Sequence, residues 1–262
     1  MEFIAVQGHR LEYRFVRVAP VDAPVIVFLH EGLGSVAMWR DFPDRIAHAA
    51  GCNALIYSRY GYGGSDPLTT ARDVRFMHDE ALYALPEMLD KLGVVRPILF
   101  GHSDGASIAL IHAGAGARPV MTEILMAPHV LVEDITIENI EAAKHAFETS
   151  DLPQKLAKYH ANVDLTFRGW NDIWLHPAFR TWNIEEFVPK VACPILVIQG
   201  EDDEYGTMDQ VARIERSAAD VEVLKLADCG HSPHRDKPDA VIAATVRFID
   251  RVCKRSNDLS GA

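Results

Sequence analysis

The sequence predicts an α/β fold with a mostly parallel, eight-stranded sheet flanked by helices. Two observations predict it. Short strand-like runs alternate with helical stretches along the chain, which is typical of strands joined by crossover helices. Five of these runs are almost continuously apolar, as expected for strands buried on both faces. A chain of 262 residues is long enough to form one such domain together with a small insertion.

The expected strands follow one another from the first residues onward. Residues 3–6 and 11–18 alternate between apolar and polar side chains, which indicates a half-exposed antiparallel hairpin at one edge of the sheet. The central strands are the five apolar runs 25–29, 54–57, 98–100, 124–126 and 195–198. The last strand is expected at 221–226.

Helical stretches separate these strands, and one segment interrupts the alternation. The expected helices cover 36–50, 74–92, 105–115, 208–218 and 239–251. Residues 131–187 contain many helix formers, several aromatic residues and no convincing strand. We therefore expect a core domain of residues 1–130 and 188–262, with 131–187 as a helical insertion.

The overall composition narrows the classes of partner. A formal net charge of −11 disfavours binding to nucleic acids or anionic membranes and leaves a small-molecule partner as the expectation. The chain has no long apolar segment and no basic start followed by one, so we expect a cytoplasmic protein. Four dispersed cysteines and twelve histidines form no metal-ligand pattern. No metal and no cofactor are expected.

The pentapeptide GHSDG at residues 101–105 carries the strongest chemical signal. It follows the buried run 98–100 and precedes the helical stretch 105–115. In that context a G-x-S-x-G sequence forms a sharp turn that presents the serine at its apex. The alternative is an ordinary strand-to-helix turn in which Ser103 caps the helix.

Two later loops supply candidate partners for Ser103, and other motifs extend the pattern. The segments 199–203 and 227–234 follow the strands at 195–198 and 221–226, so all three sites meet at the carboxyl edge of the sheet. HEGLG at 30–34 and GYGGS at 61–65 each follow an expected strand. Together these motifs resemble those of the α/β-hydrolase superfamily over nearly the whole chain. The resemblance implies the α/β-hydrolase fold, with residues 131–187 as a helical lid before the strand that carries the acid.

The resemblance also implies the roles of a nucleophile and a base. Ser103 is the expected nucleophile, because a serine hydroxyl attacks carbonyl carbon when a base removes its proton. His231 is the expected base, since it follows Gly230 as the family histidine usually follows a glycine. His102 and His234 are its rivals.

The acid and the oxyanion hole are less sharply defined by the sequence. Asp203 stands three residues after Gly200, the usual place of the acid in this family, and the adjacent Asp202 is the alternative. The backbone N–H groups of Gly32 and Asp104 are the expected donors to the oxyanion.

The candidate substrate contacts include two departures from the family pattern. Glu31 stands where glycine is usual, and Asp104 stands where a small or apolar residue is common. Both place negative charge beside a site that must stabilise an anion, so one hypothesis is that they bind a cationic substrate group. Valacyclovir hydrolase, an α-amino-acid ester hydrolase of this superfamily, has a similar serine-aspartate-glycine elbow. Leu33, Trp170 and Trp174 complete the candidate set, although aromatic residues of the insertion more often form its own core.

Three functions remain open at this point. The first is a serine hydrolase that cleaves a small ester, a thioester or a related acyl bond through an acyl-enzyme. The second is a carbon–carbon bond hydrolase acting on a product of aromatic ring cleavage, which uses the same three residues and a similar lid. A binding protein that lost turnover is the third, and the retention of all three candidate residues argues against it.

Overall fold

The fold is an eight-stranded sheet in a computed structural model that describes residues 1–116 and 118–260. The strand order is β1-β2-β4-β3-β5-β6-β7-β8, with β1 and β2 antiparallel to their neighbours and the other pairs parallel. This confirms the predicted α/β sheet and its antiparallel edge hairpin. The strands are β1 (Glu2–Val6), β2 (His9–Val16), β3 (Val25–Leu29), β4 (Asn53–Tyr57), β5 (Ile98–His102), β6 (Thr122–Met126), β7 (Ile195–Gly200) and β8 (Val221–Leu226).

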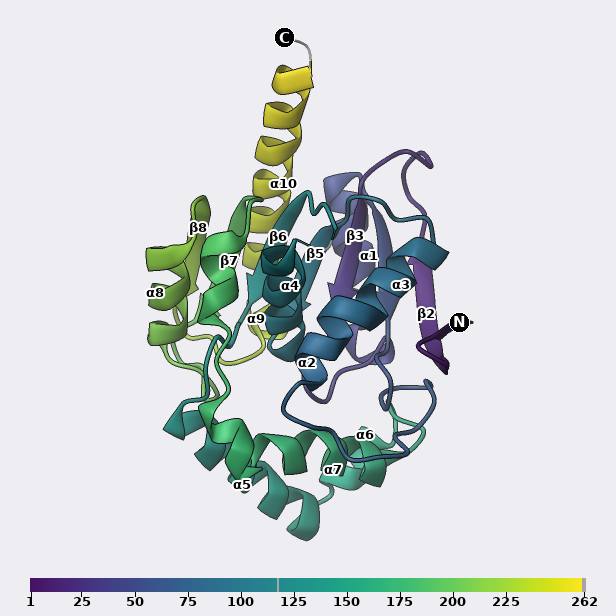
Figure 1. The fold of residues 1–262 in the computed structure, drawn as a ribbon, viewed down its shortest axis with the longest axis vertical. Helices are drawn as coiled ribbons and strands as arrows, with labels where there is room; N and C mark the ends of the chain where they lie inside the picture. Colours follow the sequence, from purple (N-terminus) through teal and green to yellow (C-terminus); the bar gives the residue numbers. More distant parts are fainter. Residues whose placement is uncertain (117, 261–262) are drawn as a thin grey trace.

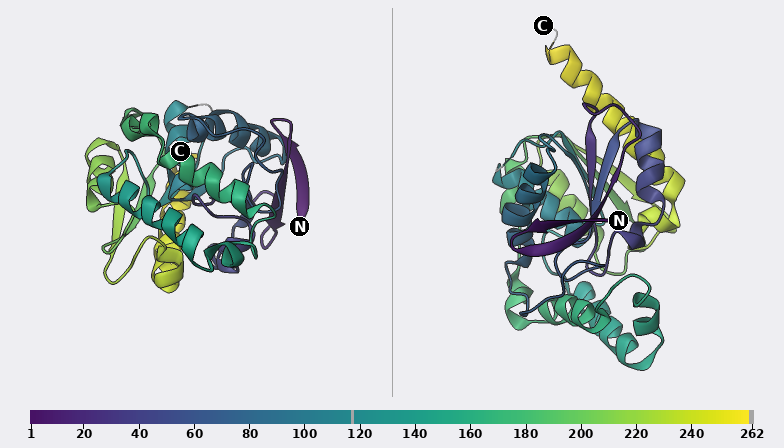
Figure 2. Two further views of the ribbon diagram at one scale, coloured as in Figure 1. Left: turned by 90° about the horizontal axis from the view of Figure 1, so that it is seen from below. Right: turned by 90° about the vertical axis from the view of Figure 1, so that its right-hand side faces the viewer.

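Helices cover both faces of the sheet, which explains why the central strands are apolar throughout (Figures 1 and 2). One face packs against α1 (Phe42–Ala50), α9 (Pro233–Asp236) and α10 (Pro238–Ser260). The other face packs against α2 (Phe76–Asp79), α3 (Leu85–Lys91), α4 (Asp104–Ala115) and α8 (Met208–Ser217).

Two of the predicted helices are divided, and one is longer than expected. The stretch 36–50 contains a short 3₁₀ turn, η1 (Ala37–Trp39), and α1 begins separately with Pro43 in its first turn, where proline is tolerated. The stretch 74–92 consists of α2, the π-helical turn η2 (Glu80–Ala84) and α3, which again has a proline near its start. Helix α10 continues to Ser260 rather than ending at 251.

Residues 131–187 hold helices and no described strand longer than a single bridge, between Leu131 and Asn183. Figure 2 shows this segment below the carboxyl ends of the parallel strands, away from the two helical layers. The 3₁₀ helix η4 (Glu185–Lys190) crosses the expected boundary at 187/188 and packs against α4 and α8. The elements are α5 (Asp134–Thr149), α6 (Leu152–Leu156), α7 (Val163–Trp174), η3 (Pro177–Thr181) and η4 (Glu185–Lys190).

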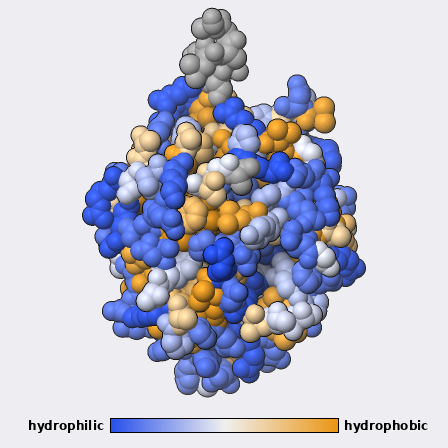
Figure 3. All heavy atoms as spheres, in the orientation of Figure 1, coloured by the Kyte–Doolittle hydropathy of each residue, from blue (hydrophilic) through white to orange (hydrophobic). Residues whose placement is uncertain are grey.

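The surface is mainly polar on the face drawn in Figure 3, where hydrophobic residues lie in small groups among hydrophilic ones. Exposed large hydrophobic side chains come from separate parts of the chain, such as Val21, Tyr83, Val95 and Leu165. Of the helices that the structure describes, none has both the length and the hydropathy to cross a bilayer.

Glu123 is an unusual residue for a central strand. It lies on β6 between Leu99 of β5 and Ile195 of β7, is fully buried, and its carboxyl oxygens have no hydrogen-bond partner among the described residues. Burial raises the pKa of Glu123 to about 8. The folded protein therefore holds this carboxyl group neutral over a pH range in which the unfolded chain ionises it.

This burial predicts a pH-dependent loss of stability. Because the pKa of Glu123 is higher in the folded state, stability is lost as pH rises from about 4.5 to about 8. Glu123→Gln removes this titrating group, so its free energy of unfolding should not fall with pH in this way. Relative to the parent, the variant should therefore become more stable by roughly 3 to 5 kcal/mol as the pH is raised from about 5 to about 9. Denaturant unfolding of both proteins at the two pH values measures this gain, and parallel pH profiles would show that Glu123 does not titrate in this way.

Candidate active site

Ser103 occupies a strained turn between β5 and α4. Its backbone φ of 54° and ψ of −119° lie in a region that residues other than glycine rarely adopt. The glycines on either side have no room for a side chain. A Cβ at Gly101 would lie 2.4 Å from the carbonyl oxygen of Gly105, and one at Gly105 would lie 2.0 Å from that of Leu29. The close packing of α4 on the sheet thus requires the G-x-S-x-G sequence.

The hydroxyl of Ser103 makes no capping hydrogen bond to α4, so the alternative of a capping serine is wrong. Its Oγ lies 2.9 Å from Nε2 of His231 instead. On the opposite side of the ring, Nδ1 lies 2.8 and 2.9 Å from the two carboxylate oxygens of Asp203. An ionised carboxylate only accepts, so Nδ1 carries the proton and Nε2 accepts from the serine hydroxyl. The structure brings these three predicted residues together.

Asp203 is held in place by further donors. Its Oδ1 accepts from the backbone N–H groups of Tyr205 at 2.8 Å and Gly206 at 3.2 Å, and its Oδ2 accepts from Nε2 of Gln199 at 2.8 Å. Burial alone raises the pKa of Asp203, but the hydrogen bond and the charge of His231 hold it below its usual value. The carboxylate therefore stays ionised and oriented toward the imidazole.

The pKa of His231 is shifted in the opposite direction. Burial lowers it, but the hydrogen bond and charge of Asp203, followed by the charges of Glu204 and Glu31, raise the pKa above 6.5. The imidazole is thus a stronger base than an isolated histidine. A base of this kind can take a proton from Ser103 near neutral pH.

The rival residues have other contacts. His102 donates from Nε2 to the backbone carbonyl of His231 at 2.7 Å, so it supports the loop that carries His231. His234 is buried and packs against Trp39 and His102. Asp202 is exposed, whereas Asp203 is buried beside the imidazole.

The two predicted oxyanion donors lie at the expected positions. Asp104 is the first residue of α4, where backbone N–H groups have no partner within the helix. Gly32 follows β3 in the HEGLG loop and packs against Trp170 so closely that a Cβ would lie 2.1 Å from the indole Nε1. Both residues border the same cavity as Ser103, so their N–H groups are candidates for stabilising an oxyanion.

The two acidic departures from the family pattern both have basic partners. Oε2 of Glu31 lies 3.4 Å from Nδ1 of His102 and its Oε1 lies 3.6 Å from Arg235. Oδ2 of Asp104 lies 3.7 Å from Nη2 of the buried Arg59. The guanidinium groups of Arg235 and Arg59 offset the negative charge that the sequence places beside the oxyanion site. Arg59 is itself fixed by donating to the backbone carbonyls of residues 30 and 31.

A cavity of about 150 Å³ opens beside Ser103 and His231. All five predicted substrate contacts line it, namely Glu31, Leu33, Asp104, Trp170 and Trp174. The two tryptophans also pack within the insertion, Trp170 on Phe167 and Trp174 on Phe179, so they combine the two roles that the sequence left open.

Four further lining residues were missed by the sequence analysis. His129 follows β6 and Tyr205 follows β7. Because loops after parallel strands lie at the carboxyl edge of the sheet, the sequence could have predicted that both residues lie near the site. Thr136 and Ile140 come from α5. No pattern in the sequence placed the α5 residues at the site, because their position depends on how α5 packs over the sheet.

His160 is a fifth residue that the sequence analysis missed, and it does not line the cavity. It lies between α6 and α7, and its Nδ1 accepts from the backbone N–H of Gly63 at 3.0 Å. The other ring nitrogen, Nε2, therefore carries the proton and donates to the carbonyl of Leu33 at 2.8 Å. Burial lowers the pKa of His160, which favours this neutral form. One side chain thus links the insertion to the loops that follow β3 and β4.

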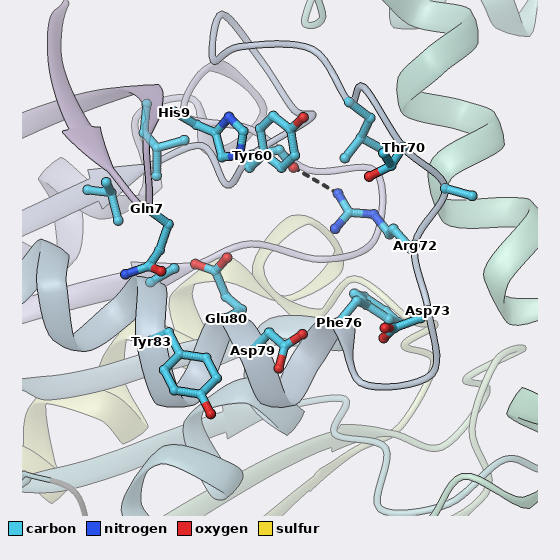
Figure 4. Close-up of a pocket in the computed structure, with 15 residues that line it drawn as sticks. Gln7, His9, Tyr60, Thr70, Arg72, Asp73, Phe76, Asp79, Glu80 and Tyr83 are labelled. Carbon is cyan, nitrogen blue, oxygen red and sulfur yellow. Dashed lines mark hydrogen bonds between the residues drawn. The ribbon is translucent and has the colours of Figure 1, made fainter.

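A separate cavity of about 430 Å³ lies between the β1–β2 hairpin, the 60–73 loop and α2 (Figure 4). Its wall includes Glu80 and Arg72, and Nη2 of Arg72 donates to the carbonyl of Tyr60 at 2.8 Å. Ser103 does not border this cavity. Within the described residues, no group of three or more His, Cys, Asp or Glu side chains could hold a metal ion.

Comparisons with known proteins agree with this architecture. The family model described as "Alpha/beta hydrolase family" matches residues 26–244. The chain is 24% identical over 250 residues to a 2-hydroxy-6-oxononadienedioate/2-hydroxy-6-oxononatrienedioate hydrolase of Klebsiella pneumoniae, covering 86% of this chain and 87% of that protein.

Solved structures show the same fold at low identity. A carboxylesterase structure from Nitrososphaera gargenis superposes with a TM-score of 0.78 at 16% identity, covering 97% of this chain and all of that one (100%). The enol-lactonase of Burkholderia xenovorans superposes with a TM-score of 0.73 at 20% identity, over 95% of this chain and 100% of that one.

Proposed function

The chain belongs to the alpha/beta hydrolase family, and from this premise we propose that it hydrolyses esters or thioesters of small, uncharged acyl groups through an acyl-enzyme on Ser103. The observation that carries the proposal is the series of hydrogen bonds from Ser103 through His231 to Asp203. Ser103 and His231 border a small cavity that has no lysine or arginine among its lining residues. Pockets for drug-sized ligands have at least about 300 Å³, so the substrate is small.

The reaction proceeds in two half-reactions. His231 Nε2 takes the proton of Ser103 as Oγ attacks the carbonyl carbon, and the resulting oxyanion accepts hydrogen bonds from the N–H groups of Gly32 and Asp104. The imidazolium, stabilised by Asp203, then gives the proton to the leaving alcohol or thiol. Water attacks the acyl-enzyme with His231 again as base, releasing the acid and restoring Ser103.

The insertion of residues 131–187 acts as the lid of this site in our proposal. Side chains of α5 and α7 line the same cavity as Ser103. Residues 1–130 and 188–262 then form the core that carries the reacting groups. Closing the cavity with apolar side chains excludes water and strengthens the hydrogen bonds to the oxyanion.

A second candidate, hydrolysis of a carbon–carbon bond, is favoured by the names of the similar proteins. Several relatives at 22 to 25% identity are named 2-hydroxy-6-oxononadienedioate hydrolases. A dioate carries two carboxylates at neutral pH, and burying them requires cationic partners. The charged lining residues here are the acidic Glu31 and Asp104, and the arginines beside them are already paired. This charge distribution favours an uncharged ester.

Labelling and a substrate panel test the proposal together. We expect a fluorophosphonate probe to label Ser103, because it reacts with an activated serine. The panel compares small acetate and propanoate esters, their thioesters and 2-hydroxy-6-oxononadienedioate, with substrate loss followed by chromatography. Faster cleavage of the dioate than of every ester would favour the second candidate, and absence of both labelling and turnover would contradict both.

A further inference from the structure

The HEGLG loop after β3 contains two linked hydrogen bonds that lead to Gly32. The carbonyl of Leu33 accepts from Nε2 of His160 at 2.8 Å. The N–H of Gly34 donates to the carbonyl of Glu31 at 3.0 Å. Residues 33 and 34 share one peptide group, and residues 31 and 32 share another. Both are trans, and in a planar trans peptide the carbonyl and the N–H point in opposite directions. The donor on Leu33 is therefore connected, through two peptide groups, to the N–H of Gly32.

The N–H of Gly32 is the free end of this series. It donates to no atom of the described residues, and Gly32 borders the same cavity as Ser103. Hydrogen bonds that follow one another from donor to acceptor in the same direction polarise one another, so each strengthens the next. The series thus fixes the direction of the Gly32 N–H and makes it a stronger donor. A donor aligned in advance needs no reorganisation when charge develops on the substrate oxygen.

His160 begins the series and is held in one tautomer. The N–H of Gly63 donates to its Nδ1 at 3.0 Å, so Nε2 carries the proton. The N–H of Ala161 donates to the carbonyl of Gly63 at 2.9 Å, which holds the same segment a second time. His160 is only 5% exposed, so water competes little for its ring nitrogens. Within the described part of the chain, no other donor reaches the carbonyl of Leu33.

A second hydrogen bond attaches the insertion to the core without entering this series. Oγ1 of Thr166, in α7, donates to the carbonyl of Gly61 at 2.7 Å, and Thr166 is 3% exposed. This bond holds the insertion on the loop after β4 and does not involve the HEGLG loop. Thr166 and His160 therefore distinguish simple attachment of the insertion from an effect on Gly32.

Resting on the ester hydrolysis proposed above, we propose that His160 is a positioning residue of the oxyanion hole, which aligns and polarises the N–H of Gly32 through the peptide groups of residues 31–34. It does not line the cavity, so it acts through the loop rather than on the substrate. The insertion then contributes to catalysis as well as covering the site. Loss of the hydrogen bond to Leu33 should weaken binding of the transition state more than binding of the substrate.

Two substitutions of His160 separate the hydrogen bonds of its two ring nitrogens. His160→Asn can place an amide oxygen near the position of Nδ1 and accept from Gly63, but its side chain is too short to reach Leu33. His160→Gln is long enough to carry an N–H to the position of Nε2. Thr166→Val is the matched control, because it removes a buried hydrogen bond of the insertion with little change in shape.

Steady-state kinetics with p-nitrophenyl acetate compare these variants. We expect kcat of His160→Asn to fall by about 10-fold or more with a smaller change in KM, because a misaligned donor loses part of the stabilisation that an oxyanion donor provides. His160→Gln should recover most of this loss. Thr166→Val should keep the kcat of the parent. Thermal unfolding of each variant checks that the fold is retained.

A pair of ketones measures the oxyanion hole itself. Oγ of Ser103 bonds to the carbonyl carbon of trifluoroacetone as its proton passes to His231, and the carbonyl oxygen becomes an oxyanion. Acetone binds without this reaction. The ratio of their inhibition constants within one protein cancels losses caused by partial unfolding. We expect the preference for trifluoroacetone to fall by about 10-fold in His160→Asn and to stay unchanged in Thr166→Val.

The outcomes separate this inference from the proposed function. An unchanged ketone preference in His160→Asn would show that His160 only attaches the insertion. Equal falls in His160→Asn and Thr166→Val would assign the effect to attachment in general, and equal falls in His160→Asn and His160→Gln would assign it to the shape of the imidazole. Each of these results overturns the inference. Failure of fluorophosphonate labelling, with no turnover of any ester by the parent, would instead contradict the function on which the inference rests.

Discussion

Replacing Ser103 with alanine is expected to lower kcat/KM for p-nitrophenyl acetate by roughly 10⁴-fold or more. The strained turn holds Oγ at 2.9 Å from Nε2 of His231, so the variant loses both the attacking atom and the proton that the base would take. The remaining oxyanion donors and the cavity leave only a small residual rate. Steady-state kinetics and fluorophosphonate labelling both measure the loss.

The control for this variant is a serine away from the cavity. Ser217 is exposed at the end of α8, so Ser217→Ala should keep the kinetics of the parent. Thermal unfolding of both variants checks that the fold is retained. Activity of Ser103→Ala within about tenfold of the parent would assign the nucleophile to another residue.

Replacing Asp203 with asparagine is expected to lower kcat by about 10²- to 10⁴-fold. The carboxylate fixes the tautomer with the proton on Nδ1 and stabilises the imidazolium, whereas an amide can donate to the ring and favour the wrong tautomer. Asp202→Asn is the matched control, because Asp202 is adjacent in sequence but exposed. Equal losses in the two variants would show that Asp203 has no special role.

The pH profile of the same variant gives an independent measurement. In the parent, activity is lost as pH falls through the pKa of His231, which Asp203 raises above 6.5. Asparagine carries no charge, so the pKa of His231 should fall and the acid limb of kcat/KM should move to lower pH. An unchanged acid limb would mean that another group controls the protonation step.

The sharp turn at residues 101–105 could be located from the sequence alone. Gly101 and Gly105 are required because α4 packs too closely on the sheet for a side chain at either position. This requirement appears in the sequence as two glycines at fixed spacing on either side of Ser103. The order of apolar runs likewise predicted the strands, because a strand buried on both faces must be apolar at successive positions. Helix boundaries were less accurate where prolines begin new helices inside a helical pattern, as at Pro43.

The sequence by itself predicted the parallel sheet and the turn at Ser103, because apolar runs and closely spaced glycines are local patterns. Its resemblance to a known family implied the candidates His231 and Asp203. Only the tertiary structure decided between neighbouring candidates, since Asp203 and Asp202 differ in which one faces the imidazole. It alone paired Asp104 with Arg59, which lies 45 positions earlier (104 − 59), and brought Trp174 of the insertion to the same cavity. The physical reason is that burial and charge pairing depend on side chains from distant segments, which no local pattern records.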